Sequence, residues 1–150
     1  MIRRLGMGTA LLLAACTAGG IPTSSGGGGG VTVQVSLTQF AAQPTPYGSS
    51  LGYSPAVTTI AVGSQIHFIN VDSFQHTATL LKGFTSFPTG SPLGGSAETQ
   101  SGTTLSSDWS SGVLQPSSSS QTITADVAGT YLFGCYFHYS GGMRAAIVAQ

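Results

Sequence analysis

Short runs of alternating apolar and polar residues predict a chain built mainly of β-strands. In the clearest run, the side chains of Val31, Val33, Val35 and Leu37 would share one face. Six further strands are expected at residues 57–62, 65–71, 77–81, 121–127, 130–136 and 144–149. No window shows the 3.6-residue period of an amphipathic helix. The pattern therefore predicts an all-β fold, an antiparallel β-sandwich of about seven to eight strands.

The same alternation indicates which residues form the core. The inward positions of the later strands are expected to be Ile123, Ala125, Val127, Tyr131 and Phe133. His67 lies on the opposite face of its strand from Phe68, so a structural or surface role is expected for it. Trp109 lies in a polar stretch and is expected to pack over one end of the sandwich.

A long polar segment interrupts the strand pattern. Residues 83–112 are rich in Ser, Thr and Gly and contain Pro88 and Pro92. Long loops inside compact domains are uncommon, and they are usually either functional or mobile. We therefore expect this segment to be one or the other.

The N-terminus has the features of an export signal. Arg3 and Arg4 precede an apolar run over residues 5–15, which is shorter than the roughly 20 residues that a membrane-spanning helix needs. The run ends in LAAC at Cys16, which resembles the lipobox of bacterial lipoproteins. The resemblance implies cleavage before Cys16 and lipidation of its sulfur. The alternatives are an ordinary signal peptide cut nearby, or a disulfide between Cys16 and Cys135.

The interpretation of the N-terminus as a lipoprotein signal divides the chain into three parts. Residues 1–15 would be the signal peptide, residues 16–30 the lipidated Cys16 and a Gly/Ser-rich tether, and residues 31–150 the globular domain. A flexible tether of this length has an r.m.s. reach of roughly 20 Å. The predicted location is therefore outside the cytoplasm, in the periplasm or at the cell surface, with the protein anchored to a membrane by its lipid.

Composition excludes some partners. Charged residues make up 5% of the chain, against about 25% in an average domain, while hydrophobic residues make up 41%. No basic stripe suited to nucleic acid is present. Two basic and four acidic residues remain after residues 1–15 are removed, so the mature charge is near −2. Electrostatic steering of a partner should be weak, and a monomer is expected.

The residues with the clearest chemistry lie close to the C-terminus. Cys135, His138 and Met143 form the pattern Cys-x2-His-x4-Met. A thiolate, an imidazole and a thioether on one short loop form a soft site suited to copper in both oxidation states. Gly141 and Gly142 would allow that loop to fold tightly.

A site of this type needs a second histidine, and His76 is the candidate because it follows a strand and a polar turn. Zinc is less suitable, since structural zinc sites use four Cys or His ligands and methionine binds zinc poorly. The remaining alternative is that Cys135 is simply a small buried apolar side chain.

Two blocks of the sequence resemble a known family. AVGSQIHFINVDSFQHTATL and AGTYLFGCYFHYSGGM are similar to plastocyanin and its cupredoxin relatives, and SSGVLQP also resembles this family. The resemblance implies a Greek-key cupredoxin fold with one type 1 copper ion. Carried over residue by residue, it implies His76, Cys135 and His138 as equatorial ligands and Met143 as the axial ligand.

The sequence departs from the family pattern at two places. Many relatives have Asn after the first ligand histidine, where this chain has Thr77. The Thr77 hydroxyl could still form a hydrogen bond across the two ligand loops. Tyr136 and Phe137 replace a commoner small residue and proline, and their bulk is expected to alter solvent access and redox potential.

The resemblance implies a blue-copper protein that carries electrons at the cell envelope. Its redox partners would dock near His138, with Phe137 and Tyr139 around it. The alternatives are a protein that buffers or delivers copper, and a metal-free interaction module. No nucleophile, base and orienting acid occur at a recognisable spacing, so an enzyme is not expected.

Overall fold

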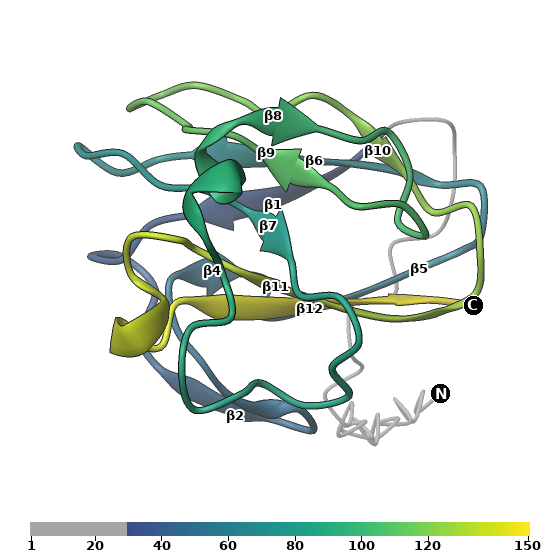
Figure 1. Cartoon of the computed structure of the whole chain (residues 1–150), viewed down its shortest axis with the longest axis horizontal. Helices are drawn as coiled ribbons and strands as arrows, with labels where there is room; N and C mark the ends of the chain where they lie inside the picture. Colours follow the sequence, from purple (N-terminus) through teal and green to yellow (C-terminus); the bar gives the residue numbers. More distant parts are fainter. Residues whose placement is uncertain (1–29) are drawn as a thin grey trace, which may run out of the picture.

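Alternating valines form the first strand, β1 (Val31–Val35), at the position that the pattern predicts. Val33 and Val35 are buried, whereas Gln34 between them is exposed. The computed structural model describes residues 30–150, and these residues form a β-sandwich (Figure 1). The predicted signal peptide, Cys16 and nearly all of the predicted tether lie outside the described residues.

Two sheets form the layers of the sandwich. The first contains, in spatial order, β10 (Ile123–Thr124), β6 (Gln65–Asn70), β1 and β4 (Tyr53–Ser54). The second contains, in spatial order, β5 (Val57–Ile60), β12 (Arg144–Ala149), β11 (Gly129–Gly134), β7 (Thr79–Leu80), β9 (Ser110–Ser111) and β8 (Gln100–Ser101).

Three small elements complete the structure. A separate hairpin pairs β2 (Gln43–Thr45) with β3 (Gly48–Ser50). The helical elements among the described residues are two short 3-10 turns, η1 (Gly95–Glu98) and η2 (Tyr139–Gly141). No helix in residues 30–150 is long and apolar enough to cross a membrane.

The all-β sandwich expected from the sequence is confirmed, with two additions. Each sheet is mixed, because β1 runs parallel to β6 and β5 runs parallel to β12. Parallel partners need a long connection between them, and residues 36–64 and 61–143 provide it. The sandwich also contains short strands that alternation did not indicate, since strands of two or three residues are too short to show a period of two.

Aromatic rings hold the two sheets together. The centroid of Phe68, from the first sheet, lies 5.2 Å from that of Phe133 and 5.5 Å from that of Trp109. Trp109 is 2% exposed. It therefore lies in the centre of the core and does not pack over one end of the sandwich as expected.

Two of the residues expected to face inward are more exposed than predicted. Val127 is 51% exposed, because β10 ends at Thr124 and the chain turns toward β11. Tyr131 is only partly buried, although it packs against the core. Ile123, Ala125 and Phe133 are fully buried, as predicted.

The long polar segment has a structural role at both faces of the second sheet. Leu105 and Trp109 belong to the main core. Phe87 and Leu93 instead join a second apolar cluster, with Leu132 of β11, on the outer face of the sheet. The segment therefore contributes to two apolar clusters and carries η1, β8 and β9.

Candidate metal centre

Antiparallel pairing of β7 with β11 brings the predicted ligands to one end of the sandwich. Gly134, the last residue of β11, lies opposite Thr79, the first residue of β7. The segment before β7 and the segment after β11 therefore leave the sheet at the same edge. His76 lies on the first of these segments and Cys135 on the second.

Backbone hydrogen bonds shape the loop that carries three of the candidates. The Cys135 N–H donates to the Met143 carbonyl (3.1 Å), and the Met143 N–H donates to the His138 carbonyl (3.3 Å). Gly142 ends the η2 turn with φ of 99°, a conformation that glycine adopts without strain. In Figure 1 this turn lies at the left end of the molecule, opposite the C-terminus.

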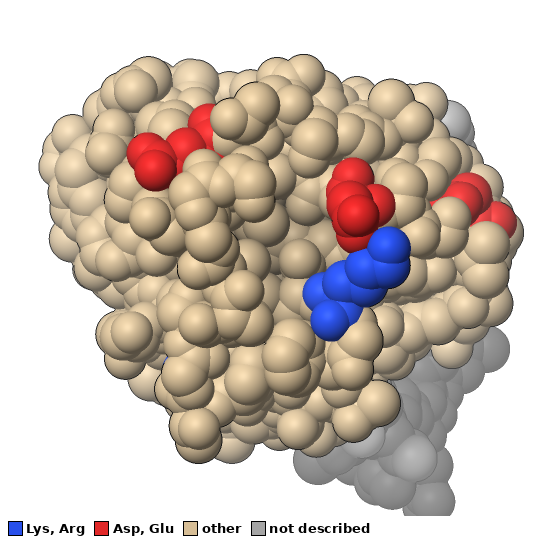
Figure 2. Space-filling view, viewed as in Figure 1, with Lys and Arg blue, Asp and Glu red and all other residues tan. Residues whose placement is uncertain are grey.

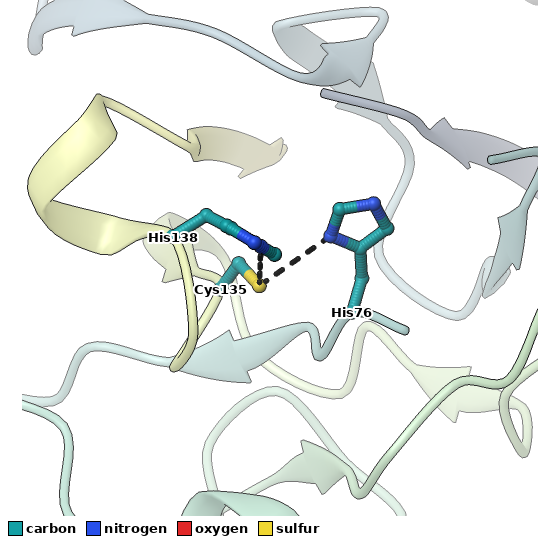
Figure 3. Close-up of side chains that lie close together, drawn as sticks. All are labelled: His76, Cys135 and His138. Atoms are coloured by element: carbon teal, nitrogen blue, oxygen red, sulfur yellow. Dashed lines mark hydrogen bonds between the residues drawn. The ribbon is translucent and has the colours of Figure 1, made fainter. Parts of the chain in front are cut away.

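Three predicted donor atoms converge (Figure 3). The Cys135 Sγ lies 3.7 Å from His76 Nδ1 and 3.6 Å from His138 Nδ1. One ligand atom from each of the three residues lies within 4.8 Å of the others. Cys135 and His76 are fully buried, and His138 is half-buried. Cys135 is a free thiol.

Met143 closes the same loop. Its side chain is completely buried, and its backbone is hydrogen-bonded to those of Cys135 and His138. The Met143 side chain fills the space where Gly52 would carry a side chain. A Cβ on Gly52 would lie 2.8 Å from Met143 Cγ and 3.3 Å from Met143 Sδ. The missing side chain at Gly52 is thus what leaves room for the thioether.

A side-chain amide organises the turn that leads to His76. Asn70, at the end of β6, donates from Nδ2 to the carbonyls of Phe74 (2.8 Å) and Leu114 (2.9 Å). His76 and Leu114 exchange two backbone hydrogen bonds of 3.1 and 2.8 Å. The His76 backbone is therefore held on two sides.

A buried carboxylate contacts Nε2 of His76, the ring nitrogen that does not face Cys135. Asp72 Oδ2 lies 3.2 Å from His76 Nε2. Burial alone would raise the pKa of Asp72. Hydrogen bonds from Thr38, His76, Ser73 and Leu37 outweigh burial and hold that pKa well below its usual range. Asp72 is therefore ionised at neutral pH.

His76 and His138 are neutral at neutral pH in this environment. Burial lowers the pKa of His76, the nearby His138 lowers it further, and Asp72 opposes both effects. Burial also lowers the pKa of His138, against the opposing charge of Asp72. With Asp72 ionised, the His76 proton resides on Nε2 and donates to the carboxylate. The Nδ1 lone pair then faces Cys135.

The thiol is protonated before metal binds. Burial raises the pKa of Cys135, although hydrogen bonds from Thr77 and neighbouring backbone groups partly offset this. A metal ion that binds here displaces the thiol proton.

Thr77 connects the two ligand segments, as expected. Its hydroxyl accepts a hydrogen bond of 2.8 Å from the Tyr136 N–H. Its own N–H points at Cys135 Sγ (3.4 Å), and its carbonyl accepts a hydrogen bond of 2.7 Å from the Tyr53 hydroxyl. Thr77 therefore forms the hydrogen bonds that bridge the two segments.

The donor set fits copper. Two imidazole nitrogens and one cysteine sulfur converge in the site, with a thioether on the same loop. Trigonal His₂Cys sites with a weak axial methionine are those of blue-copper proteins. His76, Cys135, His138 and Met143 are thus positioned as a type 1 copper site.

Other residues have different roles from those of the four candidates. His67 Nε2 lies 3.0 Å from the Thr32 hydroxyl, in keeping with a structural role. Tyr139 does not surround His138 at the surface as expected. It is 1% exposed, lies under the Arg144 guanidinium and donates to the Pro88 carbonyl. Contacts with Arg144 and Pro88 therefore hold the Tyr139 ring inside the fold.

Sequence reasoning missed two residues that support the site. Asp72 lies four positions before His76, which could have suggested a contact across a tight turn. Gly52 carries no such signal, because it is far from Met143 along the chain.

Together, the fold and the donor set define a cupredoxin, a β-sandwich protein with a type 1 copper site. The model of a family described as copper binding proteins, plastocyanin/azurin family, matches residues 41–150. The chain belongs to this family. Among curated protein sequences, none matches it significantly.

Two solved structures with TM-scores above 0.5 share this fold. A purple cupredoxin from Nitrosopumilus maritimus is 17% identical, with a TM-score of 0.51 over 80% of this chain and 99% of that chain. A reduced amicyanin mutant is 14% identical, with a TM-score of 0.51 over 84% of this chain and 87% of that chain. A copper-containing nitrite reductase from Thermus scotoductus also matches (20% identity, TM-score 0.49), and the match covers 81% of this chain and 22% of that enzyme.

Proposed function

We propose that this protein is a one-electron carrier at the cell envelope, with a single type 1 copper ion that cycles between Cu(II) and Cu(I). The convergence of His76, Cys135 and His138 on one buried point carries the proposal. His76, Cys135, His138 and Met143 would hold the copper, which would supply one-electron redox chemistry between a reduced and an oxidised partner protein. We infer no catalytic role for the protein.

The surrounding residues suit this role because they hold the donors in place. Backbone hydrogen bonds fix both ends of the loop from Cys135 to Met143, and Asn70 and Leu114 fix the segment of His76. A site whose donors are already assembled rearranges little when the charge changes. Fast electron transfer needs this property.

His138 is the proposed point of contact with redox partners. It is half-buried, whereas His76 is completely buried. Phe74 lies beside it, with ring centroids 5.6 Å apart, and Phe137 lies at 6.3 Å. Both phenylalanines are partly exposed. Docking near His138 would therefore rest on apolar contact and be brief.

Copper buffering or delivery is the less favoured function. A delivery protein needs ligands that an acceptor can reach and displace. Cys135 and His76 are fully buried and held by neighbouring groups, which supports the electron carrier instead.

The decisive experiment adds Cu(II) to the purified protein and records visible and EPR spectra beside those of Cys135→Ser. The expected result is an intense blue band with a small copper hyperfine splitting, both absent in the variant because the thiolate is gone. The loaded protein should also be reduced and reoxidised without losing copper. A colourless wild-type protein would require the electron-carrier proposal to be withdrawn.

Anchoring through Cys16 is the proposed reason for an envelope location. In cells, the wild-type protein should fractionate with membranes, and Cys16→Ser should be released from them, because one lipid-bearing sulfur is the proposed attachment. Mass spectrometry should find the lipid on the N-terminal cysteine of the mature protein. A membrane fraction that is unchanged in Cys16→Ser would contradict this anchoring.

A further inference from the structure

Asp72 differs from the other acidic residues of the described domain in being buried. Its side chain is 3% exposed, whereas Glu98, Asp108 and Asp126 are exposed. A buried charge is costly unless other groups compensate for it. Its position therefore calls for a physical explanation.

Five hydrogen bonds compensate the carboxylate. Oδ2 accepts from the N–H groups of Leu37 (2.8 Å) and Thr38 (3.3 Å), and Oδ1 accepts from the Thr38 hydroxyl (2.8 Å) and the Ser73 N–H (3.1 Å). The fifth bond comes from His76 Nε2 at 3.2 Å. Asp72 is thus fixed by the segment that follows β1 and by its own turn. It contacts His76 at Nε2, the ring nitrogen that does not face Cys135.

We propose that Asp72 is a positioning and tuning residue for the copper site, and the proposal rests on the type 1 copper function argued above. By accepting the Nε2 proton, Asp72 fixes the His76 tautomer and ring orientation that present Nδ1 to the metal. A carboxylate at the far nitrogen also makes the ligand nitrogen more basic. Both this effect and its negative charge favour Cu(II) over Cu(I), so Asp72 lowers the reduction potential.

The matched variants are Asp72→Asn and Asp126→Asn. Both remove one negative charge by the same chemical change. Asp126 is exposed and follows β10, whose Thr124 pairs with Gln65 at the start of β6, so it lies at the end of the sandwich away from the copper site. Only Asp72→Asn should alter the copper centre.

We expect Asp72→Asn to lower Cu(II) affinity about 10- to 100-fold, the usual effect of removing a partner of a ligand histidine. Each tenfold loss that Cu(I) does not share raises the potential by about 59 mV. Asp126→Asn should leave both quantities unchanged. A folded Asp72→Asn variant that matches Asp126→Asn in affinity and potential would overturn the proposal.

Thr38→Val provides an independent test should Asp72→Asn fail to fold. It removes one donor from the carboxylate while leaving the charge in place, and Thr38 is exposed, so the fold should tolerate it. The less compensated carboxylate should lower the potential, the direction opposite to Asp72→Asn. Thr38→Ser keeps the hydroxyl and is the control. An unchanged or raised potential in Thr38→Val would overturn the proposal.

A measurement on the metal-free protein separates this inference from the proposed function. Nitrogen NMR should find the His76 proton on Nε2 in the wild type, and less completely so in Asp72→Asn. A wild-type His76 protonated on Nδ1 would overturn the inference whether or not copper binds. A wild type that takes up no copper but keeps the Nε2 proton would contradict the proposed function, and Asp72 would still be the residue that orients His76.

Discussion

At the residue scale, Thr77 occupies a central position beside the candidate copper ligands. Its hydroxyl, N–H and carbonyl are all hydrogen-bonded, to Tyr136, Cys135 and Tyr53. The side chain is completely buried, so none of these contacts competes with bulk water. One residue therefore joins the segment of His76 to the loop of Cys135.

We expect Thr77→Val to destabilise the metal-free protein by about 1–3 kcal/mol, because the Tyr136 N–H loses its partner while the side-chain volume is kept. Denaturant unfolding measures this change. Thr59→Val, at an exposed position of β5, is the control and should change stability by less than about 0.5 kcal/mol. Equal effects of the two substitutions would show that the Thr77 hydroxyl does not join the segments.

At the scale of elements, the segment between β3 and β4, Leu51 and Gly52, packs against the loop from Cys135 to Met143. Leu51 exchanges backbone hydrogen bonds with Gly142 and Arg144 on either side of Met143. Gly52 has φ of +75° and lies against the Met143 side chain. This segment therefore determines how much room the Met143 side chain has.

Gly52→Ala should cost more stability than Gly63→Ala. Both glycines have positive φ, +75° and +89°, so both substitutions carry a similar backbone penalty. A Cβ at Gly63 meets nothing within 4 Å, whereas one at Gly52 lies 2.8 Å from Met143 Cγ. The added overpacking is expected to cost about 1–3 kcal/mol in denaturant unfolding.

The copper spectrum provides a second readout for the same pair. Displacement of Met143 should change the colour and EPR parameters of Gly52→Ala, because the axial ligand tunes the site. Gly63→Ala should keep the wild-type spectrum. Identical spectra and equal stability losses for the two variants would exclude a role of Gly52 in placing Met143.

At the scale of the whole molecule, the surface carries little charge. Among the described residues, two basic side chains stand against four acidic ones, and Lys82 pairs with Asp108 at 2.9 Å. Figure 2 shows a face on which charged side chains are few. Long-range electrostatic guidance of a partner is therefore weak.

Electron self-exchange between copper-loaded copies should accordingly depend little on salt. We expect the rate to change less than about twofold between roughly 0.01 and 0.1 M ionic strength, although the Debye length falls from about 30 to 10 Å over that range. NMR line broadening of partly oxidised samples measures the rate. A tenfold change in the self-exchange rate over this range would contradict the prediction. It would indicate a locally charged docking surface despite the small net charge.

Local features account for what could be predicted from the sequence. Cys135, His138 and Met143 lie on one loop, so their spacing alone indicates a shared site. Alternation located β1 and β6 because these strands are long enough to show a period of two. Trp109 was misplaced because its polar neighbours along the chain do not reveal that it packs against Phe68 and Phe133.

The sequence by itself determined the class of fold, the four candidate copper ligands and the possibility that Thr77 bridges two segments. Only the tertiary structure decided that β1 and β6 run parallel, that Asp72 contacts His76 while bound to Leu37 and Thr38, and that Gly52 makes room for Met143. The physical reason is that periodicity and ligand spacing depend on residues close together along the chain. Hydrogen-bond partners and packing contacts between distant segments are chosen only when the sheets pair and stack.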